Sequence, residues 1–220
     1  MNYRHAYHAG NHADVLKHIV LARIFALMAR KDTPFAYLDS HSGIGLYDLL
    51  GDEASRTGEW ESGIGRLVER DDLPELLQDY LGVVSALNPD GGLEFYPGSP
   101  ELARRLTRPQ DRVLLNELHP EDGRLLKANM AGERRISVHQ GDGWLLPRAF
   151  LPVAEKRGGL LIDPPFERPS AACARLWSPS GPRSRIAASS SAFTSAWRRA
   201  RRRRCSAWSC ACIRPTRRTA

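Results

Sequence analysis

The first 172 residues of the chain contain no cysteine, so the expected folded part needs no disulfide. No apolar run approaches the roughly 20 residues of a membrane span. The start of the chain is polar and rich in histidine, unlike a secretory signal. We therefore expect a cytoplasmic protein with no membrane partner.

A second set of absences separates residues 167–220 from the rest of the chain. This tail has no Lys, Tyr, Val or Met, and its large aliphatic residues are limited to Leu176, Ile186 and Ile213. Ser, Ala, Pro and 13 Arg dominate it instead, with four consecutive arginines from Arg201 to Arg204. Such a composition cannot bury enough apolar surface to offset chain entropy, so we expect the tail to be disordered.

Two interpretations of the tail remain open. It is either a natural basic extension that binds RNA, or an out-of-frame translation of a GC-rich gene. All four cysteines and three of the five tryptophans lie in the tail, and the composition changes abruptly. These features favour the out-of-frame interpretation.

The net charge also divides at this boundary. The whole chain carries +7 with a pI of about 9.6, which is typical of a nucleic-acid-binding protein. Residues 1–166 alone hold 19 basic and 24 acidic residues, a net charge of −5. The overall basic charge therefore belongs to the tail and does not by itself indicate the function of the first 166 residues.

Strand-like and helix-like segments alternate in residues 1–166, which predicts an α/β domain with a parallel sheet. Residues 47–92 interrupt the alternation and predict a small helical insertion. In it we expect helices near 59–69 and 73–87, the second with Pro74 in its first turn. Ser99 is expected to cap the next helix, with Pro100 as its first residue. The remaining expected elements are helices at 14–30, 120–131 and 143–150, and strands at 35–39, 112–117, 135–139 and 159–163.

Acidic residues lie at the ends of the expected strands. Asp39, Glu117 and Asp163 close three of them, and Asp142 follows the fourth. In an open α/β sheet, ligands bind outside the carboxyl ends of the strands, where the strand order reverses. The sequence therefore predicts a ligand site at this edge of the sheet.

The segment Asp163-Pro164-Pro165-Phe166 follows an apolar strand and indicates a specific chemistry. The prolines restrict the backbone and remove two donors. An exocyclic adenine amine is a poor nucleophile, because its lone pair is conjugated into the ring. A carboxylate at Asp163 and the Pro164 carbonyl would hold the amine hydrogens, and Phe166 would stack on the base. The alternative is a proline-rich exit from a strand with a solvated Asp163.

Residues 39–45 form a glycine-containing loop after a strand, where the backbone can approach a ligand closely. Two other residues have simple structural interpretations. His18 would be an ordinary polar residue of an amphipathic helix, and Ser99 a helix cap.

Several motifs together resemble one known family. The segments are residues 3–18 (YRHAYHAGNHADVLKH), 39–45 (DSHSGIG), 96–100 (YPGSP), 116–120 (NELHP), 141–143 (GDG) and 163–166 (DPPF). They resemble the bacterial 23S ribosomal RNA adenine-N6 methyltransferases, continuously up to Phe166, where the subfamily would have Tyr. The resemblance implies a Rossmann-like class I methyltransferase sheet with a helical insertion. Such sheets use seven strands, so the C-terminal strands are expected to be missing here.

The resemblance also implies a cofactor, a substrate and roles for individual residues. The cofactor would be S-adenosyl-L-methionine and the partner 23S ribosomal RNA, bound by a monomer at an unpaired or flipped adenine. Tyr3 and Arg4 would contact the RNA. The cofactor would be held by His18, His41, Ser99, Glu117 (on the ribose hydroxyls), Asp142 (on the adenine amine), Gly143 and Asp163.

Three alternatives stay open at this point. His5, His8 and His12 have spacings that would suit one helical face and a metal, although the chemistry needs none and none is expected. A DNA adenine-N6 methyltransferase would share the fold and the Asp163–Phe166 motif. A catalytically dead protein that binds RNA through its arginine tail is the third.

Overall fold

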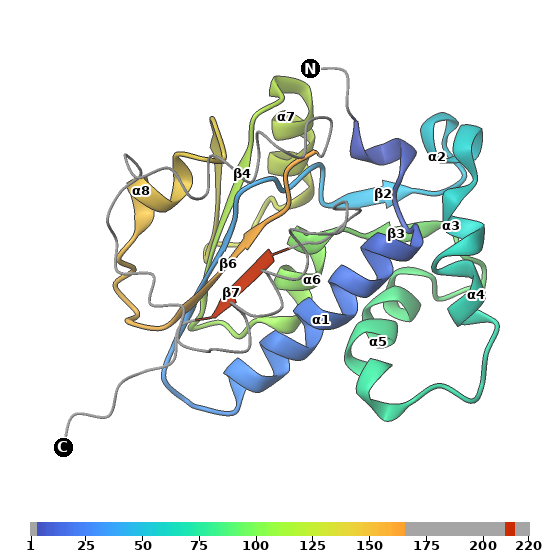
Figure 1. The fold of residues 1–220 in the computed structure, drawn as a ribbon, viewed down its shortest axis with the longest axis horizontal. Helices are drawn as coiled ribbons and strands as arrows, with labels where there is room; N and C mark the ends of the chain where they lie inside the picture. Colours follow the sequence, from blue (N-terminus) through green and yellow to red (C-terminus); the bar gives the residue numbers. More distant parts are fainter. Residues whose placement is uncertain (1–3, 166–209, 214–220) are drawn as a thin grey trace, which may run out of the picture.

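A computed structural model describes residues 4–165 and 210–213 of the chain (Figure 1). Its main sheet has five strands in the order β5–β4–β1–β6–β7, and a second sheet pairs β2 with β3. None of the helices in this described part is long and apolar enough to cross a membrane. The strands are β1 (Ala36–Asp39), β2 (Leu46–Asp48), β3 (Phe95–Pro97), β4 (Arg112–Glu117), β5 (Ile136–Gln140), β6 (Gly158–Ile162) and β7 (Cys210–Ile213). The helices are η1 (His5–Tyr7), α1 (His12–Ala29), α2 (Asp52–Thr57), α3 (Glu59–Ser62), α4 (Gly65–Val68), η2 (Glu75–Leu77), α5 (Gln78–Leu87), α6 (Ser99–Leu106), α7 (Pro120–Asn129) and α8 (Leu146–Phe150).

Four strands of the main sheet run parallel, as the sequence predicts. β1 pairs with β4 on one side and with β6 on the other, and β4 pairs with β5. The chain therefore builds outward from β1 to β5 and then returns to the other side of β1. This reversal brings the carboxyl ends of β1 and β6 together, which positions the ligand site. The α/β, Rossmann-like fold class is confirmed.

The side chains of the central strands alternate between two apolar layers. Tyr37 and Leu115 face the larger cluster, which also contains Phe25 of α1 and Leu102 of α6. Ala36, Leu38, Leu114 and Leu146 form the smaller cluster with α8. Because both faces are covered, the strands are apolar at nearly every position and not alternately apolar and polar.

The helical insertion is present but more broken than predicted. It lies between β2 and β3, which pair antiparallel. The helix expected near 59–69 is wrong as one element, because it is divided into α3 and α4 at Gly63. A Cβ at Gly63 would lie 2.1 Å from the Gly10 carbonyl oxygen, so this backbone contact leaves the site no room for a side chain. The helix expected near 73–87 starts with a 3₁₀ turn after Pro74 and becomes α-helical only at Gln78.

The outer edge of β6 is paired, contrary to the sequence-based prediction. We expected no strand in the tail and therefore an open edge, but β7 pairs antiparallel with β6 along Gly159–Ile162. An unpaired strand edge presents free donors and acceptors, which favour the addition of a strand. The predicted disorder of the rest of the tail falls on residues outside the described part of the chain.

Candidate active site

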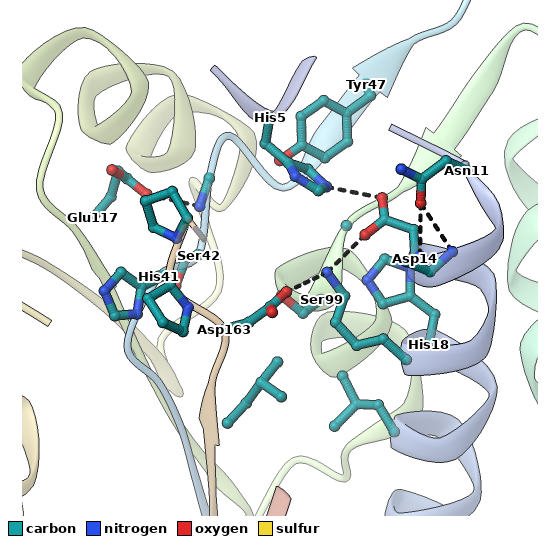
Figure 2. Close-up of a pocket in the computed structure, with 18 of the residues that line it drawn as sticks. His5, Asn11, Asp14, His18, His41, Ser42, Tyr47, Ser99, Glu117 and Asp163 are labelled. Atoms are coloured by element: carbon teal, nitrogen blue, oxygen red, sulfur yellow. Dashed lines mark hydrogen bonds and ion pairs between the residues drawn. The ribbon is translucent and has the colours of Figure 1, made fainter. Parts of the chain in front are cut away.

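A cavity of about 520 Å³ lies at the carboxyl ends of β4, β1 and β6 (Figure 2). Its walls come from α1, the loop after β1, the start of α6, the segment after β4 and the residues after β6. This volume is in the range of small-molecule and cofactor sites. Of the predicted site residues, the cavity brings together His18, His41, Ser99, Glu117, Asp163 and Pro164.

Asp39 is the last residue of β1 and holds the start of the following loop in place. Its fully buried carboxylate accepts hydrogen bonds from the Ser99 hydroxyl at 2.6 Å and the Tyr37 hydroxyl at 3.1 Å. Burial raises the pKa of Asp39 to about 6, although its hydrogen bonds oppose the shift. The predicted capping role of Ser99 is wrong: α6 is capped at Gly98 without a side-chain bond, because the Ser99 hydroxyl is directed to Asp39.

Glu117 connects the loop after β1 with the end of β4. One carboxylate oxygen accepts from the Gly43 N–H at 2.8 Å, and the other accepts from the His119 N–H at 2.9 Å. Gly43 has φ +61°, a conformation that glycine adopts at no steric cost. The carboxylate is thereby oriented at the wall of the cavity.

Gly143 packs against Ser40 and His41, and Asp142 precedes it in the turn after β5. A Cβ at Gly143 would lie 2.2 Å from the Ser40 carbonyl oxygen and 2.8 Å from the His41 ring. Asp142 accepts from the Trp144 N–H at 2.9 Å. Burial lowers the pKa of His41, while the charges of Asp163 and Asp142 oppose that shift. Neither Asp142 nor Gly143 lines the described cavity directly.

His18 is not the surface residue that a simple amphipathic helix would give. It is 1% exposed, and its Nδ1 lies 2.9 Å from the Tyr96 hydroxyl. Its Nε2 is buried and has no hydrogen-bond partner among the described residues. Burial and the charge of Lys17 lower the pKa of His18 to about 3, so the ring is neutral near pH 7.

Lys17 is the main site residue that the sequence analysis did not single out. Its Nζ lies 2.7 Å from both Asp163 Oδ2 and Asp14 Oδ1, and its side chain is 8% exposed (Figure 2). Burial alone would lower the pKa of Lys17, but the two carboxylates raise it overall, so the amine stays protonated. Asp14 and Lys17 are three residues apart on α1, a spacing that predicts their contact. Nothing in the sequence indicates the contact with Asp163.

The predicted RNA contacts are only partly within the described residues. Tyr3 and Phe166 lie outside them. Arg4 pairs with Asp122 at 3.1 Å and lies 3.8 Å from both Glu53 and Glu121. Its side chain is 33% exposed.

The three N-terminal histidines do not share one helical face. His5 lies in η1 and His12 begins α1, with Gly10 at φ +76° between them. His5 pairs with Asp14 at 2.8 Å, and His8 pairs with Glu59 at 3.0 Å. No cluster of three or more metal-binding side chains occurs among the residues described.

Comparison with known proteins extends these observations. A family model described as "Ribosomal RNA large subunit methyltransferase D, RlmJ" matches residues 32–176. The chain belongs to this RlmJ family. The resemblance stated from the sequence motifs is thereby confirmed at the level of the family.

Individual relatives show how much of the family is represented here. The chain is 48% identical over 167 residues to the ribosomal RNA large subunit methyltransferase J of Escherichia coli strain K12, covering 76% of this chain and 60% of the relative. The protein of the same name from Haemophilus influenzae strain Rd is 47% identical over 168 residues, with the same coverage. A crystal structure of protein LPL1258 from Legionella pneumophila is 38% identical with a TM-score of 0.70, covering 77% of this chain and 65% of that one. The chain thus spans about 60% of the length of the curated relatives that it matches.

Proposed function

We propose that this chain carries the methyl-transfer site of an RlmJ-family enzyme. The enzyme would transfer a methyl group from S-adenosyl-L-methionine to the N6 amine of an adenine in 23S ribosomal RNA. One observation carries the proposal: Asp163, directly after β6, faces the same cavity as His41, Ser99 and Glu117. The acceptor half and the cofactor half of such a reaction would therefore share one space.

The residues present fit the cofactor. Buried polar atoms normally have a partner, and the Nε2 that has none among the described residues belongs to His18, which lines the cavity. Gly43 lets the wall of the cavity pack closely, since a Cβ there would lie 2.2 Å from the Tyr47 hydroxyl. We assign His18, His41 and Ser99 to the amino-acid end, Glu117 to the ribose, and Asp142 with Gly143 to the adenine.

The bound cofactor supplies an electrophilic methyl group on a sulfonium. We propose that Asp163 and the Pro164 carbonyl accept the two N6 hydrogens, which directs the nitrogen lone pair toward the methyl group. As the nitrogen took up the methyl group, the cofactor's S–C bond would break and its sulfur would keep the electron pair. The nitrogen then loses one proton, and we assign Asp163 to accept it. Lys17 contacts Asp163 and stabilises its negative charge before the transfer.

RNA is favoured over DNA as the substrate, because the matched relatives are named as ribosomal RNA methyltransferases. We propose that Tyr3, Arg4 and Phe166 contact the RNA, and that Phe166 stacks on the target base. Arg4 would then exchange a contact with Asp122 for a phosphate. The proposed reaction needs no metal, and we propose a cytoplasmic monomer.

The test is transfer of labelled methyl groups to unmodified 23S RNA fragments, with a parent enzyme whose reading frame is restored near residues 167–175. Asp163→Ala should reduce transfer by a factor of about 100 or more, with cofactor affinity little changed. Asp79→Ala is the matched control, since Asp79 is exposed and pairs only loosely with Arg23 at 3.9 Å. Turnover near the parental rate in Asp163→Ala would contradict the role of this residue.

A further inference from the structure

The Asp14 carboxylate in the first turn of α1 collects three hydrogen-bond donors. Oδ1 accepts from Lys17 Nζ at 2.7 Å, while Oδ2 lies 2.8 Å from His5 Nε2 and accepts from the Gly10 N–H at 3.2 Å. The residue is 3% exposed. Burial alone would raise the pKa of Asp14, but the charges of His5 and Lys17 hold it well below its usual range. A buried, ionised and fully engaged carboxylate therefore lies one contact away from Asp163.

Asp14 determines where the Lys17 ammonium sits. A lysine side chain has four rotatable bonds, so ordering it costs conformational entropy. Lys17 lies between Asp14 on its own helix and Asp163 after β6, with both contacts at 2.7 Å. The Gly10 and His5 donors restrain the Asp14 carboxylate from its other side. Without Asp14, Asp163 would be the remaining carboxylate in contact with Lys17 among the interactions described.

The position of Lys17 matters because its ammonium contacts Asp163, the proposed proton acceptor, at Oδ2. A displaced Lys17 would change both the position and the charge surroundings of that carboxylate.

We propose that Asp14 is a positioning residue for methyl transfer, which acts by holding Lys17 against Asp163. The inference rests on the proposed function. Asp14→Asn keeps the size of the side chain, removes its negative charge and weakens the restraint on Lys17. It should lower kcat by at least about tenfold while KM for the cofactor and cofactor affinity stay near the parental values.

The position of Lys17 can be measured independently of turnover. The chain has four lysines, and Lys31, Lys127 and Lys156 are all exposed. Acylation with an amine-reactive ester, followed by peptide mass spectrometry, compares Lys17 with these three in the same molecule. We expect Lys17 to react at least about tenfold more slowly than they do, and Asp14→Asn to remove most of this protection. Asp14→Glu should restore part of it, because the charge returns.

Asp111→Asn is the matched control. Asp111 is also buried and ion-paired, but it bonds to Arg108 and the Phe35 N–H at the amino end of the sheet. It should cost stability without changing Lys17 acylation. Unchanged Lys17 protection in a folded Asp14→Asn variant would overturn the proposal, as would lost protection with unchanged kcat. A parent enzyme with the reading frame restored near residues 167–175 that shows no methyl transfer would count against the proposed function, while the acylation result would still decide whether Asp14 holds Lys17.

Discussion

Replacement of Glu117 tests the cofactor half of the site most directly. The carboxylate accepts two backbone N–H groups, from Gly43 and His119, and we assign its remaining acceptor sites to the ribose hydroxyls. A hydrogen bond to a charged group contributes about 1.5–3 kcal/mol. Glu117→Ala should therefore weaken S-adenosyl-L-methionine binding by roughly 10- to 150-fold. Glu117→Gln should lose less, because its amide oxygen still accepts one hydrogen bond.

Calorimetric titration with S-adenosyl-L-methionine measures this effect, and thermal melts of the same samples report folding. Glu117→Ala also removes the acceptor of two partly buried N–H groups, and the loss of these two hydrogen bonds should lower stability by about 1–3 kcal/mol. Glu155→Gln is the control, because Glu155 pairs with Arg112 at the opposite end of β4. A folded Glu117→Ala variant that binds the cofactor with parental affinity would remove Glu117 from the site.

Three further predictions concern the loop, the buried acid and the tail. Gly143→Ala should lower cofactor affinity and the melting temperature, because its Cβ would lie 2.2 Å from the Ser40 carbonyl oxygen. An unchanged affinity by calorimetry and an unchanged melting temperature would contradict this contact. Burial raises the pKa of Asp39 from 3.8 to about 6 in the folded state, so the folded state binds more protons than the unfolded state between these values. Stability should therefore fall by roughly 2 kcal/mol as pH rises from about 4 to 6. Urea unfolding at both pH values should show this loss in the parent but not in Asp39→Asn, and parallel profiles would refute it. We also predict that the 220-residue chain is poorly soluble and inactive, and that restoring the reading frame near residues 167–175 yields an active enzyme with a higher melting temperature. A cooperative melt and normal turnover from the unaltered chain would refute the out-of-frame interpretation.

The strand framework could be predicted from local sequence because each parallel strand is a short apolar run with polar ends. The β4 strand, for example, begins at Arg112 and ends at Glu117 as expected. Once the strands are known to be parallel, the acids that follow them must meet at one edge. Asp39, Glu117 and Asp163 were therefore found without knowledge of any tertiary contact.

The errors have the opposite origin, since each depends on a contact between segments far apart in the chain. Ser99 has the usual identity of a cap, but the buried Asp39 competes for its hydroxyl. The helix expected near 59–69 breaks where Gly63 meets Gly10. Local sequence gives His18 as an ordinary polar residue of an amphipathic helix, but its ring stacks on Tyr96. Local propensity cannot predict such competition, because the competing partner lies elsewhere in the sequence.

The two halves of the site differ in how the chain builds them, and this difference predicts how they fail. The proposed cofactor half uses the loop after β1, Ser99, Glu117 and the turn at 141–143. The proposed acceptor half depends on Lys17 meeting Asp163 across 146 residues, and Asp163 directly follows β6, whose outer edge pairs with β7 from beyond residue 165. The sequence after Pro165 should therefore affect the position of Asp163 before it affects the cofactor loop. Changes there should abolish methyl transfer first and cofactor binding only later. Equal loss of both in a chain altered beyond residue 165 would show that the halves fold as one unit.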